Sequence, residues 1–169
     1  MKKNLVLLGM MGVGKSTIGK IVAKKQGLEF VDTDINIEKK CSMKISEIFK
    51  KKGEKFFRIE EEKEVLKSLT KNNCVIALGG GAFVNESIRN NILKNAISMW
   101  LDNDLITLSK RIKWNKKRPL LNKKNNQKKI NELYSERKNI YKLANHRIVC
   151  DNLSKEDIAN KIIIFYGKY

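Results

Sequence analysis

The stretch GMMGVGKS, which runs from Gly9 to Ser16, decides the fold class of this chain. It fits the pattern GxxxxGK[ST] of a phosphate-binding loop (P-loop), and it lies between an apolar run at 4–9 and a helical pattern. A strand before the loop and a helix after it form the context that this pattern requires. The glycines of the loop lack the GxGxxG spacing of a dinucleotide-binding turn. The stretch therefore predicts a site for a nucleoside triphosphate.

Each fixed position of the loop has an expected role at the triphosphate. Backbone N–H groups at the start of a helix form a concave anion site, to which Gly12, Gly14 and Lys15 are expected to contribute. The Lys15 ammonium is expected to reach the β- and γ-phosphates, and the Ser16 hydroxyl is expected to ligate Mg²⁺. The residues predicted to hold the nucleotide are Gly12, Val13, Gly14, Lys15, Ser16 and Thr17.

Two aspartates supply the acidic partner that P-loop proteins commonly carry near the metal. The apolar run at 28–32 continues into the sequence DTD, which contains Asp32 and Asp34. Residues two apart in extended backbone point the same way, so both carboxylates are expected to face the P-loop. One would hold a metal-bound water, while the other would orient and deprotonate an attacking hydroxyl group. The alternatives are solvated acids at a strand end, or an N-cap for a helix from Ile35.

Short apolar runs alternate with longer helical patterns along the whole chain. This order, with strands that are apolar on both faces, is typical of a parallel sheet covered by helices. We predict an α/β fold with three layers (αβα), a five-stranded parallel sheet, and one P-loop kinase domain over 1–169. Segment 113–127 is polar, contains the only proline, and is predicted to be a mobile lid. The predicted strands are 4–9, 28–32, 74–78, 96–101 and 146–150, and the helical patterns are 15–26, 43–71, 85–95, 102–112, 127–145 and a last helix capped by Ser154 and Asp157.

Composition narrows the class of protein further. The chain has 36 Lys and Arg against 18 Asp and Glu, which gives a formal net charge of +18. The lysines are scattered and no nucleic-acid-binding motif accompanies them, so we interpret the charge as a solvated surface and expect no specific nucleic-acid partner. No apolar run reaches the roughly 18–20 residues that cross a bilayer. Three cysteines without metal-binding spacing predict free thiols and a cytoplasmic protein, and the single core predicts a monomer.

Four further motifs follow the P-loop and the DTD sequence in order. FFRIEE places Arg58 three residues before Glu61, a helical spacing at which the carboxylate can orient the guanidinium group. GGG at 79–81 follows a predicted parallel strand, at the end where ligands bind in open α/β sheets. RPLL places Arg118 in the predicted lid, and RKNIYKLA begins at Arg137.

Together these motifs resemble the shikimate kinases, small members of the nucleoside-monophosphate-kinase-like P-loop family. The resemblance runs in order from Gly9 to Ala144. It implies transfer of the γ-phosphoryl group of ATP, with Mg²⁺, to the 3-hydroxyl of shikimate. The products would be shikimate 3-phosphate and ADP, in chorismate and aromatic amino acid biosynthesis. The resemblance also implies a substrate-binding helical region at about 33–62 and a lid at about 113–127.

The resemblance further implies how the acceptor would be bound. Asp34 would bind the shikimate hydroxyls and act as the base for the 3-hydroxyl, which leaves Asp32 to hold Mg²⁺ with Ser16. Arg58 and Arg137 would bind the substrate carboxylate, because a planar guanidinium group suits bidentate contacts. The residues of the substrate-binding turn would be Gly79, Gly80 and Gly81, and those around the substrate ring would be Ile45, Phe49, Phe57, Pro119 and Leu120.

At the nucleotide, the resemblance implies two more arginines. Arg118 would move in with the lid and join Lys15 at the transferring phosphoryl group, and Arg111 would line the adenine site. Closure of the lid would exclude water and suppress ATP hydrolysis. One departure from the family pattern is Met10, which stands where many members have an aromatic residue.

Two other interpretations stay open at this point. A gluconate or nucleotide kinase shares the P-loop and lid, but a gluconate kinase is not expected to combine GGG with Arg58 and Arg137. A nucleotide kinase should have residues that recognise the base, and the sequence shows none that we can identify. The other interpretation is a basic nucleotide-sensing or nucleic-acid-binding module with a degenerate kinase site. The intact set of Lys15, Ser16, Asp32 and Asp34 argues against it, and its signature would be polynucleotide binding that weakens steeply with salt.

Overall fold

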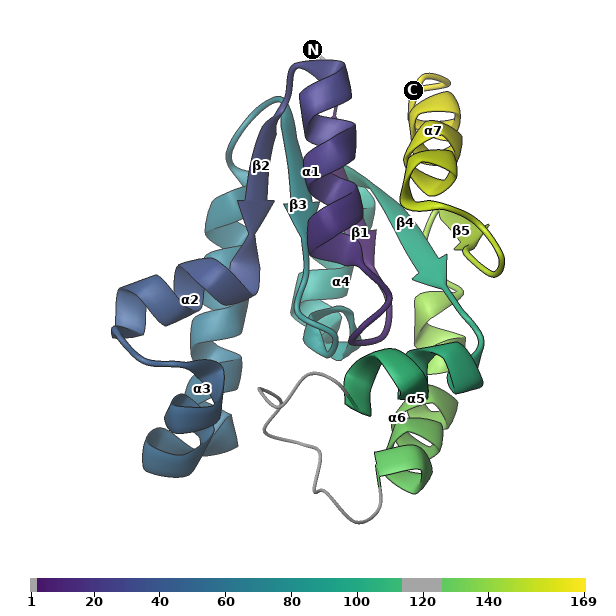
Figure 1. Cartoon of the computed structure of the whole chain (residues 1–169). Helices are drawn as coiled ribbons and strands as arrows, with labels where there is room; N and C mark the ends of the chain where they lie inside the picture. The colour runs from purple at the N-terminus through teal and green to yellow at the C-terminus, as the bar shows by residue number, and fades with distance from the viewer. Residues whose placement is uncertain (1–2, 114–125) are drawn as a thin grey trace.

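The strands form one parallel sheet in the order β2-β3-β1-β4-β5 in the computed structural model, which describes residues 3–113 and 126–169 (Figure 1). The central strands are buried over their whole length because helices cover both faces of the sheet. The predicted three-layer fold with a five-stranded parallel sheet is confirmed within these residues. The strands are β1 (Asn4–Leu8), β2 (Glu29–Asp32), β3 (Cys74–Ala77), β4 (Ala96–Asp102) and β5 (His146–Val149).

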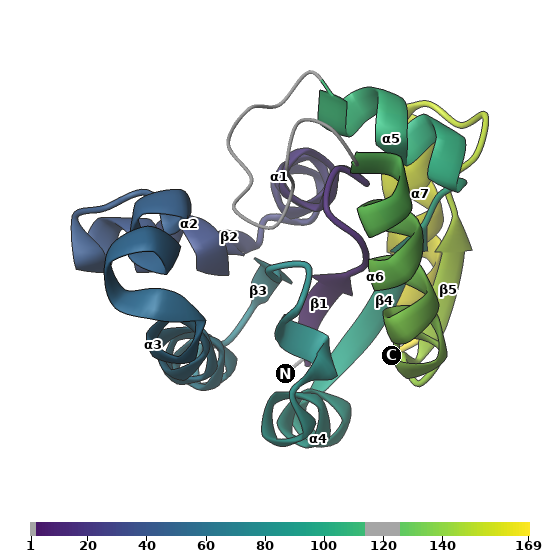
Figure 2. The same cartoon turned by 90° about the horizontal axis from the view of Figure 1, so that it is seen from below.

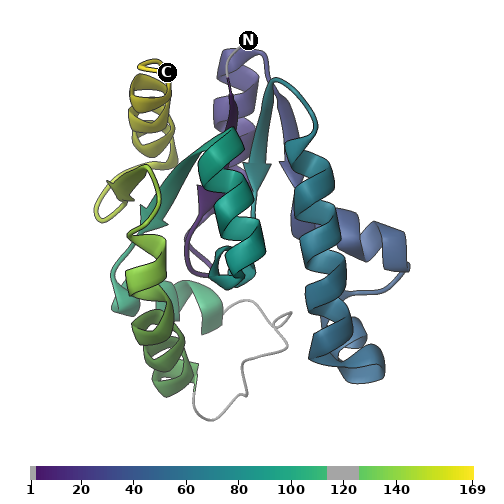
Figure 3. The same cartoon turned by 180° about the vertical axis from the view of Figure 1, so that it is seen from behind.

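Helices cover the two faces of this sheet. The first and last helices pack together on one face, and the third and fourth pack on the other (Figures 1 and 3). A capping box between Ser154 and Asp157 starts the last helix, as the sequence predicts. The helices are α1 (Lys15–Gln26), α2 (Thr33–Cys41), α3 (Ile45–Leu69), α4 (Glu86–Asn95), α5 (Leu105–Lys113), α6 (Asn126–Tyr141) and α7 (Lys155–Tyr166), with a 3₁₀ turn η1 (Ala82–Val84) after β3.

The segment after β2 differs from the sequence prediction. Helix α2 begins at Thr33, directly after the strand, so Asp34 lies in the first turn of a helix. The expectation that Asp32 and Asp34 point the same way in extended backbone is therefore wrong. Asp32 is the last strand residue and also the N-cap of α2, because its side chain accepts a hydrogen bond from the backbone N–H of Ile35.

Helix α3 has a kink that the sequence pattern does not reveal. Gly53 has φ 81° and ψ 167°, a conformation that glycine tolerates and that divides the helix into two segments. The kink allows Phe49 and Phe57 to meet across it, with ring centroids 4.8 Å apart. The two aromatic residues thus meet across the kink, one from each of the two helical segments that Gly53 separates.

The apolar core has two separate parts. The larger cluster lies between the sheet and its helices, and it includes all of β1 apart from Asn4. A smaller cluster of Ile37, Ile48 and Phe57 joins α2 to α3 away from the sheet. Among the described residues, no helix is both long and apolar enough to cross a membrane.

Candidate active site

The P-loop joins the central strand β1 to helix α1. Gly14 is the N-cap of α1 with φ 103°, and no side chain of the described residues caps the helix there. The first N–H groups of α1 are therefore not satisfied by a cap, which suits them to bind an anion. The buried Lys15 ammonium folds back over the loop and donates to the carbonyl oxygens of Gly9 and Met10, at 2.8 and 3.0 Å. Val13 is buried beneath the loop, whereas Ser16 and Thr17 are exposed.

The Asp32 carboxylate connects the P-loop to the start of α2. Its Oδ2 accepts a hydrogen bond of 2.5 Å from the Ser16 hydroxyl, while its Oδ1 accepts from the N–H of Ile35 at 3.2 Å. Asp32 is thus a helix cap, as one alternative drawn from the sequence has it, and its carboxylate also faces the P-loop. A hydroxyl and a carboxylate oxygen at this spacing form a donor set that suits a hard cation such as Mg²⁺.

The pair of Ser16 and Asp32 is more typical of a Mg²⁺ site than of a metal site built from protein ligands alone. Mg²⁺ is commonly bound by one or two protein oxygens together with phosphate oxygens and water. Within residues 3–113 and 126–169, no group of three or more His, Cys, Asp or Glu residues could hold a metal ion. The oxygens of Ser16 and Asp32 match the one or two protein ligands that such a metal takes.

The glycine turn after β3 lies beside the P-loop because β1 and β3 are paired in register, with Leu7 opposite Ala77. A Cβ atom at Gly79 would lie 2.6 Å from Oδ1 of Asp34 and 2.7 Å from Oε1 of Glu61. Side chains of α2 and α3 therefore press directly on the main chain of the turn.

The third glycine of the turn faces an arginine. A Cβ atom at Gly81 would lie 2.7 Å from Nη1 of Arg58. In the structure, carboxylate and guanidinium groups of the site already occupy that space.

Arg58 is held by two glutamates of its own helix. Its Nη1 donates to Glu61 at 2.7 Å, which confirms the predicted pair three residues apart. Its Nε and Nη2 donate to one oxygen of Glu54, at 3.2 and 2.9 Å. Burial raises the pKa of Glu61, while the positive charges of Arg58 and Arg137 act in the opposite direction. Glu54 was missed from the sequence because it is one of several charged residues on a helix with many lysines and glutamates.

Arg137 reaches the same turn from the other side. It lies in α6, is only 7% exposed, and its Nη1 donates to the carbonyl oxygen of Gly80 at 3.1 Å. In Figure 2, which looks onto the carboxyl ends of the strands, α2 and α3 lie on one side of the turn and α6 lies on the other. The two arginines of the predicted acceptor site thus converge on the turn from helices that lie on opposite sides of it.

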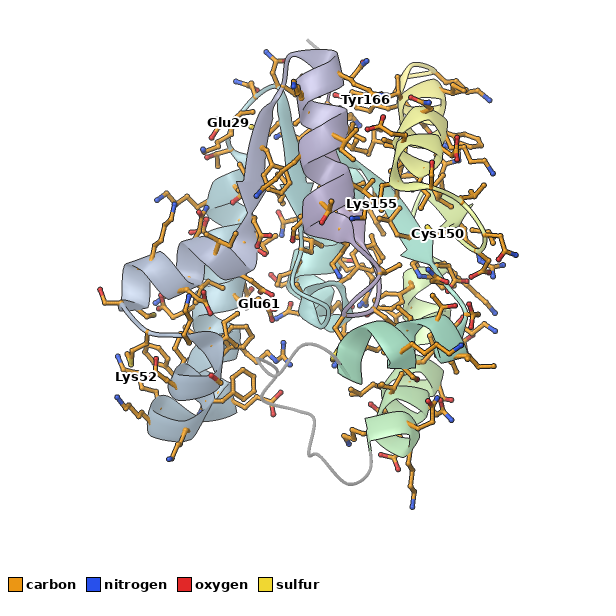
Figure 4. The ribbon with its side chains drawn as sticks, viewed as in Figure 1. Glu29, Lys52, Glu61, Cys150, Lys155 and Tyr166 are labelled. Atoms are coloured by element: carbon orange, nitrogen blue, oxygen red, sulfur yellow. The ribbon has the colours of Figure 1, made fainter. Side chains whose placement is uncertain are left out.

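A pocket lies where these elements meet. Glu61 points into the region between α3 and the strand ends (Figure 4). The structure brings together Asp34, both arginines, all three glycines and the three predicted ring-packing residues of α3. The residues that line the pocket are Met11, Asp34, Ile45, Phe49, Phe57, Arg58, Glu61, Gly79, Gly80, Gly81 and Arg137.

Other predicted site residues are not part of this arrangement. Most of the predicted lid at 113–127, with Arg118, Pro119 and Leu120, lies outside the described residues. Arg111 belongs to helix α5, and its side chain also lies outside the described part of the structure.

Comparisons with known proteins agree with this geometry. The family model described as shikimate kinase matches residues 11–166. A shikimate kinase of Sulfurihydrogenibium sp. is 44% identical over 161 residues, with 95% of this chain and 96% of the relative covered. A shikimate kinase of Bacillus subtilis is 42% identical, with 96% and 88% covered. The structure of a shikimate kinase from Acinetobacter baumannii in complex with shikimate has a TM-score of 0.96 and 31% identity, with 99% and 94% covered. This chain therefore belongs to the shikimate kinase family.

Proposed function

We propose that this chain transfers the γ-phosphoryl group of ATP to the 3-hydroxyl of shikimate, giving shikimate 3-phosphate and ADP for chorismate and aromatic amino acid biosynthesis. One observation carries the proposal: a carboxylate and two arginines converge on the glycine turn after β3, the strand that pairs in register with the strand before the P-loop. Family membership supports the same acceptor, since the solved relative from Acinetobacter baumannii is described in complex with shikimate.

The acceptor would be oriented by opposite charges at its two ends. Arg58 and Arg137 would bind the shikimate carboxylate, because guanidinium groups form paired hydrogen bonds with carboxylates. Asp34 would accept a hydrogen bond from the 3-hydroxyl and take its proton as the new bond to phosphorus forms. Ile45 and Phe57 would cover the ring and restrict its rotation, which favours in-line attack.

The nucleotide would be held by the P-loop. Lys15 would exchange its contacts with the loop carbonyls for the β- and γ-phosphates, and the N–H groups of α1 would bind the phosphate oxygens. Ser16 and Asp32 would hold Mg²⁺, which supplies positive charge to the transferring phosphoryl group when bound. We assign Arg118 to stabilising the charge of the transferring phosphoryl group and Arg111 to lining the adenine site, both on the family resemblance alone.

The experiment that tests this function measures shikimate-dependent release of ADP from MgATP. We expect rapid turnover in the native chain and a loss of about 10²-fold or more in kcat for Asp34→Asn, since the variant keeps the shape of the side chain but removes the base. Gluconate and nucleoside monophosphates serve as control acceptors. No turnover with shikimate, in a chain that still binds MgATP, would overturn the acceptor assignment and leave the nucleotide site intact.

We further propose a cytoplasmic monomer without a specific nucleic-acid partner. The free state of all three cysteines supports a reducing compartment. Light scattering during size-exclusion chromatography would test the monomer. Binding of a random polynucleotide at several salt concentrations would test the solvated-surface interpretation of the +18 charge.

A further inference from the structure

The peptide of Gly80 lies where the nucleotide half and the acceptor half of the site touch. A Cβ atom at Gly80 would lie 3.3 Å from the backbone nitrogen of Met11 and 3.8 Å from the carbonyl oxygen of Gly9, both in the P-loop. The same atom would lie 3.7 Å from Nη1 of Arg137. The orientation of this one peptide therefore affects the spacing between the acceptor and the nucleotide.

Two donors from α6 bind the carbonyl oxygen of Gly80. One is Nη1 of Arg137, at 3.1 Å, and the other is the hydroxyl of Tyr141. Tyr141 lies four residues after Arg137, one turn along the same face of the helix. The arginine is therefore not the sole support of the turn, and the two side chains share one acceptor.

The tyrosine is held rigidly, as a fixed support requires. Its side chain is fully buried, and its ring packs at 5.9 Å between centroids on Trp100 of β4. The hydroxyl oxygen lies 3.9 Å from the sulfur of Met10 in the P-loop. Burial raises the pKa of Tyr141, against the opposing charge of Arg137, so the hydroxyl keeps its proton at neutral pH and acts as a donor.

We propose that Tyr141 is a positioning residue for the acceptor, acting through the Gly80 carbonyl and the guanidinium group of Arg137. A guanidinium group has five N–H donors in a fixed plane, and one of them is used on Gly80. While the tyrosine holds the carbonyl in place, that contact fixes the plane in which the remaining donors meet the substrate carboxylate. This inference rests on the function proposed above.

Loss of the Tyr141 hydroxyl is expected to affect one substrate more than the other. In Tyr141→Phe the ring still packs on Trp100, but the Gly80 carbonyl keeps only the arginine, and both can turn together. The conformation of the P-loop is stabilised by other contacts, since Lys15 donates to the carbonyl oxygens of Gly9 and Met10. We therefore expect the KM and Kd for shikimate to rise about fivefold, within the range for one hydrogen bond, and the KM for MgATP to change less than about twofold.

Tyr166→Phe is the matched control. Tyr166 is also buried, and its hydroxyl also donates to a backbone carbonyl, that of Lys3 at 2.6 Å. In Figure 4 it lies near the top of the view, well away from Glu61, which lines the pocket. Both variants are expected to lower Tm to a similar extent, whereas only Tyr141→Phe should change the constants for shikimate. A structural role alone would lower Tm without separating the two substrates.

A double-mutant cycle with Arg137→Lys tests the route of the effect. If the tyrosine acts through the arginine, the double variant should raise the shikimate Kd less than the product of the two single effects. Unchanged shikimate constants in Tyr141→Phe, equal changes for both substrates, or fully independent effects in the cycle would each overturn the inference. The proposed function is tested separately, since it fails only if the unmutated chain does not phosphorylate shikimate.

Discussion

Gly79→Ala is a sharp test of the site because the added methyl group meets two carboxylates at once. Gly79 does not have a positive φ, so alanine introduces no backbone strain there. The new Cβ atom would lie 2.6 Å from Oδ1 of Asp34 and 2.7 Å from Oε1 of Glu61. Ordinary contact begins at 3.4 Å, so each carboxylate must withdraw by roughly 0.7 to 0.8 Å.

This displacement should damage activity far more than folding. Both contacts are with the ends of side chains that can rotate, so we expect a loss of about 1 kcal/mol or somewhat more in the free energy of unfolding. Asp34 is the proposed base, and an error of about 1 Å in the position of a reacting group can cost about 10²-fold in rate. We therefore expect kcat to fall by about two orders of magnitude, measured as shikimate-dependent ADP release at saturating MgATP.

Gly27→Ala is the control for this experiment. Gly27 ends α1 with φ 63° and has no atom within 4 Å of its Cβ position, so alanine there adds backbone strain and no collision. It should lower the free energy of unfolding by about 1–2 kcal/mol and leave the kinetic constants unchanged. If Gly79→Ala kept full kcat and the KM for shikimate, the contact between the turn and the two carboxylates would have no part in the reaction.

Three other perturbations separate stability from binding. Burial raises the pKa of Glu61 above its ordinary 4.5, so the folded chain holds that proton more tightly than the unfolded chain. The free energy of unfolding, compared with that of Glu61→Gln by urea titration, should therefore fall as the pH rises from 4.5 through the raised pKa, and a pH-independent difference would contradict this. Gly53→Ala should lower the free energy of unfolding, measured by urea titration, by about 1 kcal/mol, because alanine is strained at φ 81°. It should also weaken shikimate binding, because the kink brings Phe49 against Phe57. Unchanged binding would refute the connection between the kink and the acceptor site. Asp32→Asn should raise the Mg²⁺ concentration needed for half-maximal activity at fixed ATP by about tenfold. At saturating Mg²⁺, the KM for shikimate should not change.

The sequence predicted the sheet and the P-loop well because both depend on local pattern. Strands that are buried on both faces appear as continuous apolar runs, and the ends of β1 and β3 agree with the predicted runs to within one residue. The spacing from Ser154 to Asp157 likewise predicted the start of α7. These features need no knowledge of distant contacts.

The acceptor half was harder to predict because its geometry depends on distant contacts. Asp34 was assigned by strand periodicity, but it reaches the pocket from the first turn of α2. Nothing in the local spacing reveals the kink of α3 at Gly53. The contact of Arg58 with Glu54, by contrast, joins residues four apart on one helix and follows a spacing that the sequence already contains. Tyr141 was visible only as an apolar helix position, since its hydrogen bond joins residues 61 apart in the chain.

The small apolar cluster affects how specificity for other acceptors can evolve in this fold. Phe57 belongs both to that cluster, with Ile37 and Ile48, and to the lining of the pocket. The large core beneath the P-loop shares none of these three residues. Adaptation to a wider or narrower acceptor would therefore require Phe57 to change together with its two partners, while the nucleotide half could be inherited unaltered. Related kinases with other acceptors are expected to differ at these three positions as a set.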